Sequence, residues 1–196
     1  MSYGTLAVNP DLHTNWPWKY DFRGEVPPTR PEEYNFMLEQ TKNFGARHTA
    51  LDAACGWVPP WHIFGHNLAH HYEIPVIAMD LNPEHLWLFY PHPRIIRMTG
   101  DVCGMPFANN SFDIVYCLSV LEHLPPSYRS RAAIELARVC SHHLAITADN
   151  INIDGFAETL THYGFNCGER EDQEGEPVLT ETGKEVYYII GDKVEP

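Results

Sequence analysis

Short hydrophobic segments alternate with helix-forming segments along the middle of the chain, and each hydrophobic segment is paired with a polar residue at its end. Four such segments follow one another: LDAACG at 51–56, IAMD at 77–80, GDV at 100–102 and FDIVYCL at 112–118. Alternation of strand and helix is typical of a parallel sheet with right-handed crossovers. Because such sheets bind ligands beyond the carboxyl ends of their strands, the pattern predicts a nucleotide-type pocket at one sheet edge.

We therefore expect an α/β fold, with a Rossmann-like doubly wound sheet of about seven strands. The sheet should be mostly parallel with an antiparallel last strand, and helices should cover both faces. The expected strands are 48–53, 75–80, 94–98, 112–118, 143–147, 165–171 and 185–190, and the expected helices are 31–45, 60–72, 83–89, 127–140 and 154–163. Gly164 stands where a left-handed helix cap is favoured, and the acidic, turn-rich segment 172–183 indicates a solvated hairpin connection.

The domain organisation predicted from the sequence is an N-terminal arm, 1–31, followed by a single domain, 32–196. The arm contains five prolines, which preclude a regular helix. Its dense aromatic residues offer a large apolar area for burial, so we expect an ordered arm laid over the domain. It would either form a lid over the pocket or cover helices at the sheet edge. The aromatic residues concerned are Trp16, Trp18, Tyr20 and Phe22, with Trp57 and Trp61 as candidate partners.

Charge and cysteine usage restrict the partners and the compartment. With 13 Lys and Arg against 26 Asp and Glu, the net charge is −13, and such a field repels the phosphate backbone of a nucleic acid. No apolar run approaches the ~18 residues of a membrane span. The N-terminal residues contain no basic region followed by an apolar stretch, so we expect no secretory signal. The five cysteines have no C-x-x-C spacing, which favours a reduced, cytoplasmic protein. Nothing in the sequence indicates an oligomeric state.

The order and spacing of the four segments resemble the class I S-adenosylmethionine-dependent methyltransferases over 46–191. The fourth segment and the turn after it, which contains LEH at 121–123, are similar to the F-D-x-V and L-E-H elements of many small-molecule members. The first segment keeps the acidic residue and one glycine of the pattern D-x-G-x-G-x-G, with Ala54 and Val58 at the outer glycine positions. Alanine is a mild change there if its φ stays negative, whereas Val58 followed by two prolines indicates a different turn.

This resemblance implies S-adenosylmethionine as the cofactor and S-adenosylhomocysteine as the product. Asp80, at the end of the second strand, would accept both ribose hydroxyls. Asp101 would accept the adenine amino group while the backbone N–H of Val102 donates to a ring nitrogen, and the small residues after Asp52 would let the backbone approach the methionine tail. The expected cofactor-binding residues are Asp52, Ala53, Ala54, Cys55, Gly56, Trp57, Asp80, Leu81, Asp101, Val102, Cys117 and Leu118.

The expected reaction is methyl transfer to an oxygen or nitrogen of a small molecule. The segment 117–120 lacks both the N/D-P-P-Y/F motif of amino-methylating DNA enzymes and the Pro-Cys of pyrimidine-carbon methylators. His123, just past the fourth strand, is the first candidate for a general base, unless it only caps or packs the turn. Asp149, just after the expected fifth strand, is a second candidate on the acceptor side.

Two other classes of function remain open at this stage. A domain of this fold that binds the cofactor or a partner without turnover would tolerate an irregular glycine turn. A Rossmann-type nucleotide-dependent oxidoreductase would share the acidic end of the second strand but would need a G-x-G-x-x-G motif, which Ala54 and Val58 interrupt. His62, His66 and His70 share one helical face and two of them could bind zinc or nickel, but we expect a solvated face and no metal.

Overall fold

The computed structural model describes residues 37–56, 63–87, 92–149, 154–167, 178–179 and 185–194. The predicted arm, Trp57 and the glycine-position residue Val58 lie outside these ranges. The strands are β1 (Ala50–Ala53), β2 (Val76–Asp80), β3 (Ile95–Thr99), β4 (Phe112–Leu118), β5 (Cys140–Asp149), β6 (Phe165–Asn166), β7 (Val178–Leu179) and β8 (Glu185–Lys193). The helices are α3 (Ile63–His71), α4 (Pro83–Trp87), α5 (Pro126–Val139) and α6 (Asp154–His162), with the 3-10 turn η2 (Leu121–His123) and a helical segment at 37–40.

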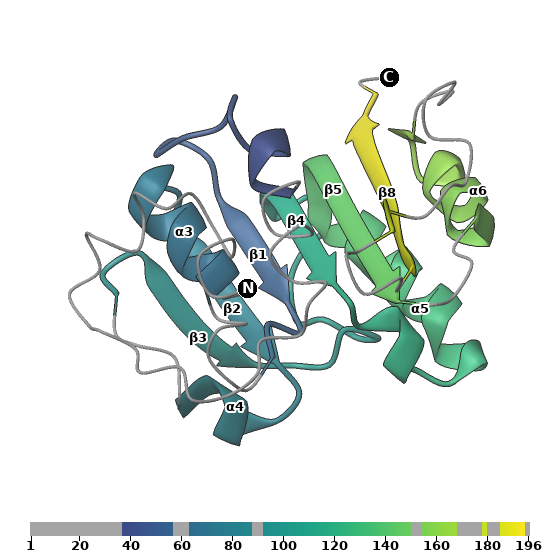
Figure 1. Cartoon of the computed structure of the whole chain (residues 1–196), viewed down its shortest axis with the longest axis horizontal. Helices are drawn as coiled ribbons and strands as arrows, with labels where there is room; N and C mark the ends of the chain where they lie inside the picture. Colours follow the sequence, from purple (N-terminus) through teal and green to yellow (C-terminus); the bar gives the residue numbers. More distant parts are fainter. Residues whose placement is uncertain are drawn as a thin grey trace.

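All eight strands belong to one sheet, whose order is β3-β2-β1-β4-β5-β8-β6, with β7 also paired to β8 (Figure 1). Strands β1 to β5 run parallel to one another, and β8 is antiparallel to β5. The predicted α/β fold with an antiparallel last strand is therefore confirmed. In this order the carboxyl ends of β3, β2, β1 and β4 lie side by side, which places the four sequence segments along one edge of the sheet.

The C-terminal part of the sheet differs from the prediction in two places. Strand β6 ends at Asn166, short of the predicted end at 171. Two residues of the predicted solvated connection form β7, in which Val178 pairs with Val186 and Leu179 with Glu185. Pattern alone could not show this, because a two-residue strand has no periodicity and depends on the long neighbouring strand β8 for its hydrogen bonds.

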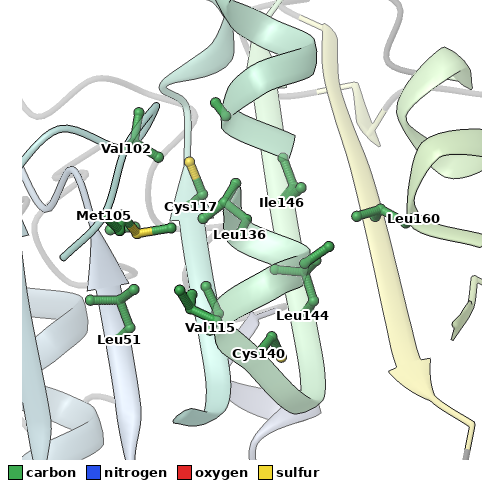
Figure 2. Close-up of a cluster of buried hydrophobic side chains, with 14 of the residues drawn as sticks. Leu51, Val102, Met105, Val115, Cys117, Leu136, Cys140, Leu144, Ile146 and Leu160 are labelled. Atoms are coloured by element: carbon green, nitrogen blue, oxygen red, sulfur yellow. The ribbon is translucent and has the colours of Figure 1, made fainter. Parts of the chain in front are cut away.

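Helices cover both faces of the sheet, as predicted. One face packs against α3 and the segment 37–41, and the other packs against α5 and α6 (Figure 1). Strand β4 is buried on both sides because Val115 and Cys117 point to the α5 face, whereas Ile114 and Tyr116 point to the α3 face. This double burial explains its nearly continuous hydrophobic sequence. Figure 2 shows the α5-face cluster, in which side chains from β1, β4, β5 and α5 meet.

The loop between β3 and β4 is part of the same core. Val102 and Met105 from this loop are 6% and 5% exposed and lie beside Cys117 and Leu136 (Figure 2). A loop that buries apolar side chains in this way has a fixed course, so the polar residue just before it is also held in place.

Three smaller features complete the fold. Gly164 has a φ of +85°, so the predicted left-handed cap at the end of α6 is confirmed. All five cysteines are free, and Cys167 is the only one of them that is not fully buried. Within the described ranges, no helix combines the length and the apolar character that a membrane crossing needs.

Candidate functional site

The turn after β1 has the backbone of a glycine-rich turn although one glycine is replaced. Ala54 has a φ of +57° and Gly56 a φ of +83°, and the N–H of Cys55 between them donates to the carbonyl of Met79 in β2 at 2.9 Å. The condition under which alanine would be harmless, a negative φ, is therefore not met. Ala54 is held in the left-handed region at a cost of roughly 1–2 kcal/mol, which the surrounding structure must offset.

Asp80, the last residue of β2, connects three parts of the sheet edge. Its Oδ2 accepts the backbone N–H of Gly56 at 3.0 Å, and its Oδ1 accepts the backbone N–H of Asn82 at 2.9 Å. The Nδ1 atom of His85, on α4, lies 2.8 Å from the same Oδ1. Asp80 thus links the turn after β1 to the turn after β2, and the residue is buried, at 7% exposure.

Asp52 lies in β1 next to this carboxylate and is 4% exposed. Burial, and secondly the charge of Asp80, raise the pKa of Asp52 from its ordinary value of 3.8 to about 7. Its Oδ2 has no hydrogen-bond partner among the described residues. A buried carboxylate oxygen without a donor is costly, so this atom marks a position where a ligand that carries a donor or a positive charge would be stabilised.

The loop after β3 brings a third aspartate to the same edge. The N–H of Gly100 donates to the carbonyl of Asp80 at 3.0 Å, and a Cβ on Gly100 would lie 2.5 Å from Sδ of Met79. A side chain at position 100 would therefore have to displace the side chain of Met79. Asp101 is exposed, and its Oδ1 accepts the N–H of Cys103 at 2.8 Å, while Val102 is buried. The carboxylate of Asp101 stands at the rim, and the backbone that carries it is fixed by its neighbours.

An ion pair on α5 holds the loop between β3 and β4 in place. The guanidinium of Arg138 donates to the carbonyls of Met105 at 3.0 Å and Phe107 at 2.7 Å, and Oε2 of Glu135 accepts the N–H of Met105 at 2.8 Å. Nε of Arg138 lies 2.6 Å from Oε1 of Glu135, and this hydrogen bond is the main reason why the pKa of Glu135 is lowered. The i,i+3 spacing in the sequence is compatible with an ion pair, but nothing in the pattern shows its backbone partners.

The end of β4 carries two expected cofactor-binding residues, Cys117 and Leu118, whose side chains are buried. Cys117 is 0% exposed and packs in the α5-face core, and burial raises the pKa of its thiol, so its side chain does not point to the rim. Leu118, at 9% exposure, packs on the opposite face of the sheet. Sequence reasoning missed Ser119, which is buried with a φ of +50° and donates its N–H to Oγ1 of Thr147 at 2.8 Å. A strained residue other than glycine carries no sequence signal.

The two candidate catalytic residues occupy the same edge by their position in the fold. His123 is exposed at the end of η2, and its backbone N–H donates to the carbonyl of Val120 at 3.0 Å. Asp149 is the last residue of β5, whose carboxyl end neighbours that of β4. The structure describes the backbone of Asp149 but not its side chain.

Polar and apolar groups at this edge fit a nucleoside that carries positive charge. Leu81 directly follows Asp80 and is 67% exposed, so it offers an apolar surface that suits the face of a flat base. Asp52 and Asp80 supply two carboxylates, one with a buried oxygen that lacks a donor. Burial and the two carboxylates also raise the pKa of the Cys55 thiol, so this side chain remains neutral.

Of the three histidines expected on a solvated helix face, His66 is buried, which contradicts the expectation, whereas His70 is exposed. His66 is 3% exposed, and its ring lies 6.2 Å from that of His92, which in turn lies 6.3 Å from the ring of His70. The described part of the chain holds no group of three histidine, cysteine or acidic side chains that could bind a metal ion, and His62 lies outside it.

Known proteins share a family pattern and a fold with this chain. Residues 51–143 match the family described as "Methyltransferase domain". The structure of magnesium protoporphyrin IX methyltransferase from Synechocystis PCC 6803 with bound SAH is similar to that of the chain, with a TM-score of 0.64. The two sequences are 14% identical, and the comparison covers 87% of this chain and 90% of that chain. The PH0226 protein from Pyrococcus horikoshii OT3 is 15% identical, with coverages of 94% and 99% and a TM-score of 0.64.

A third structure with a similar fold is that of a cyclase. The [4+2]-cyclase SpnF is 15% identical to the chain, with 91% of this chain and 86% of that chain covered and a TM-score of 0.68. At such identities these structures show a shared fold. No curated protein matches the chain.

Proposed function

We propose that the chain is a class I S-adenosylmethionine-dependent methyltransferase that methylates an oxygen or nitrogen of a small molecule. The match of residues 51–143 to a methyltransferase family and the fold shared with solved structures such as the magnesium protoporphyrin IX methyltransferase support this proposal. The observation that supports this most is the meeting of Asp52, Asp80 and the Asp101 loop at one sheet edge. That edge is where open α/β sheets bind nucleotides.

We assign the parts of the cofactor to these residues by their chemistry. Asp80 would accept the ribose hydroxyls, and Asp101 with the N–H of Val102 would hold the adenine edge against the apolar side chain of Leu81. The turn from Asp52 to Gly56 would take the cationic amino-acid part, because the unpartnered oxygen of Asp52 is stabilised by positive charge. When bound, the cofactor supplies an electrophilic methyl group on its sulfonium.

The protein's main task in such a transfer is alignment. Holding two reactants in line can lower the barrier by about 7–11 kcal/mol. Ser119 and η2 would form the acceptor side of the pocket, and the buried link from Ser119 to Thr147 keeps that backbone in one conformation. His123 is exposed at this rim and is our candidate for the base that removes a proton from the acceptor, with Asp149 as the second candidate.

A small-molecule acceptor is favoured by the charge of the chain and by the end of β4. The net charge of −13 disfavours a nucleic acid, and the sequence CLSV at 117–120 lacks the motifs of base-methylating enzymes. We propose a reduced, cytoplasmic setting on the same grounds as before, the five free cysteines.

The test is production of S-adenosylhomocysteine from S-adenosylmethionine with a panel of phenols, carboxylic acids, amines and amino acids. We expect turnover with at least one class and loss of turnover in Asp80→Asn. Glu84→Gln, which removes a carboxylate from an exposed neighbouring position, is the matched control and should keep turnover. For the base, turnover of His123→Ala should fall at pH 6–9, and full turnover over that range would remove His123 from this role.

A second candidate function is binding of the cofactor without methyl transfer. Two observations favour this alternative: alanine replaces a glycine of the turn at position 54, and a cyclase has the same fold. It predicts that S-adenosylhomocysteine binds and that no acceptor in the panel is methylated. An oxidoreductase would instead bind NADH in preference to S-adenosylhomocysteine, which a paired titration would show.

A further inference from the structure

His85 is the one charged or ionisable side chain within hydrogen-bond distance of the Asp80 carboxylate among the described residues. It lies on α4, five residues after Asp80, with its Nδ1 at 2.8 Å from Oδ1. The side chains of His85 and Asp80 are 27% and 9% exposed. A hydrogen bond between an imidazole and a carboxylate at this depth is shielded from water and restrains the carboxylate strongly.

The short helix α4 holds His85 in this position. Oδ1 of Asn82 accepts the N–H of Glu84 at 2.9 Å and caps the helix, while the carbonyl of Asn82 accepts the N–H of His85 at 3.1 Å. The N–H of Asn82 in turn donates to Asp80 at 2.9 Å. The turn, the cap and the imidazole therefore form one closed arrangement around Oδ1 of Asp80.

The two carboxylate oxygens of Asp80 accept different numbers of hydrogen bonds. A carboxylate has about four lone-pair positions, two on each oxygen. Oδ1 already accepts from Asn82 and His85, whereas Oδ2 accepts from Gly56 alone among these contacts. Oδ2 thus keeps a lone pair for a hydroxyl group, and the two donors on Oδ1 fix the plane in which that lone pair lies.

We propose that His85 is a positioning residue for the cofactor, acting through Asp80 to fix the orientation of Oδ2, the oxygen that receives a ribose hydroxyl. The proposal rests on the placement of the ribose at Asp80. His85 sets affinity for the ribose and thereby selects nucleosides that carry free hydroxyls. It takes no part in the methyl transfer step, because its contact is with the carboxylate and not with the reacting atoms.

The test compares two ligands, S-adenosylhomocysteine and an analogue that lacks both ribose hydroxyls, by calorimetry on the full chain. The variants are His85→Leu, which removes the donor, and His85→Asn, whose side-chain Nδ2 is attached to Cγ as Nδ1 is in histidine. Glu84→Gln, on the same helix, is the control. Urea unfolding of each variant shows that it is folded before ligand is added.

We expect His85→Leu to weaken binding of S-adenosylhomocysteine about tenfold and to leave binding of the dideoxy analogue within twofold of wild type. His85→Asn should restore affinity for S-adenosylhomocysteine to within about threefold, and Glu84→Gln should change neither ligand. If an active acceptor is known, kcat of His85→Leu at saturating cofactor should equal that of wild type.

Equal weakening of both ligands in His85→Leu would overturn the proposal, since a purely structural role of His85 affects the whole site. Unchanged or tighter binding of S-adenosylhomocysteine in that variant would overturn it as well. Failure of the wild-type chain to bind S-adenosylhomocysteine at all is a separate outcome, which contradicts the proposed function itself.

Discussion

Replacing Asp52 by asparagine should remove a pH-dependent loss of stability that the buried carboxylate causes. In the unfolded chain this carboxyl loses its proton near pH 4, whereas burial and Asp80 raise its pKa in the folded protein to about 7. Between these values the folded state holds one more proton than the unfolded state, so stability falls as pH rises and levels off above pH 7. At about 1.36 kcal/mol per pKa unit the full loss is about 4 kcal/mol.

The assay is urea unfolding of wild type and Asp52→Asn between pH 5 and 8, analysed by linear extrapolation. Over this range the wild type should lose about 3 kcal/mol relative to the variant, because asparagine stays neutral. The absolute offset between the two proteins also contains the new amide, so the change of their difference with pH is the quantity that decides. Glu84→Gln removes an exposed carboxylate and should follow the wild-type curve. A difference between Asp52→Asn and wild type that stays constant from pH 5 to 8 would refute the reasoning.

Two further predictions concern the walls of the site. Ala54→Gly should raise the free energy of unfolding by about 1 kcal/mol, because Ala54 has a φ of +57° that glycine adopts without strain. The control Ala53→Gly, in β1, should lower the free energy of unfolding by about 0.5–1 kcal/mol. Equal effects of the two substitutions would contradict the strain argument. Arg138→Met should lower the free energy of unfolding by about 2 kcal/mol and weaken S-adenosylhomocysteine binding, because the carbonyls of the β3–β4 loop lose a charged donor. The control Arg131→Met, at an exposed position of the same helix, should stay within about 0.5 kcal/mol of wild type. Equal stability of the two variants would show that Arg138 does not hold the loop.

The order of strands and helices was predictable because each parallel strand is buried on both faces and therefore has a hydrophobic run of its own. Strand β4 was predicted with its observed bounds, Phe112–Leu118, for this reason. The positions of Asp80 and Asp101 along one edge follow from the same pattern, since parallel strands end at the same side of a sheet. Strand β7 could not be predicted, because its two residues depend on a partner that lies later in the chain.

Local conformation and side-chain partners at the site were not predictable. The positive φ of Ala54 and Ser119 results from the surrounding structure, since both residue types disfavour that region. The side chain of Cys117, an expected cofactor-binding residue, lies in the core because alternation along β4 turns it to the α5 face. The hydrogen bond of His85 to Asp80 depends on where the short helix α4 begins, which an Asn-Pro pair indicates only in general terms.

The central claim is that the rim formed by Asp52, Asp80 and Asp101 binds one adenosine moiety. A crystal structure of the chain grown with S-adenosylhomocysteine tests it most directly. We predict the ribose hydroxyls within hydrogen-bond distance of Asp80 and the adenine amino group within that distance of Asp101. A ligand bound elsewhere on the chain, or a ribose remote from Asp80, would contradict the account.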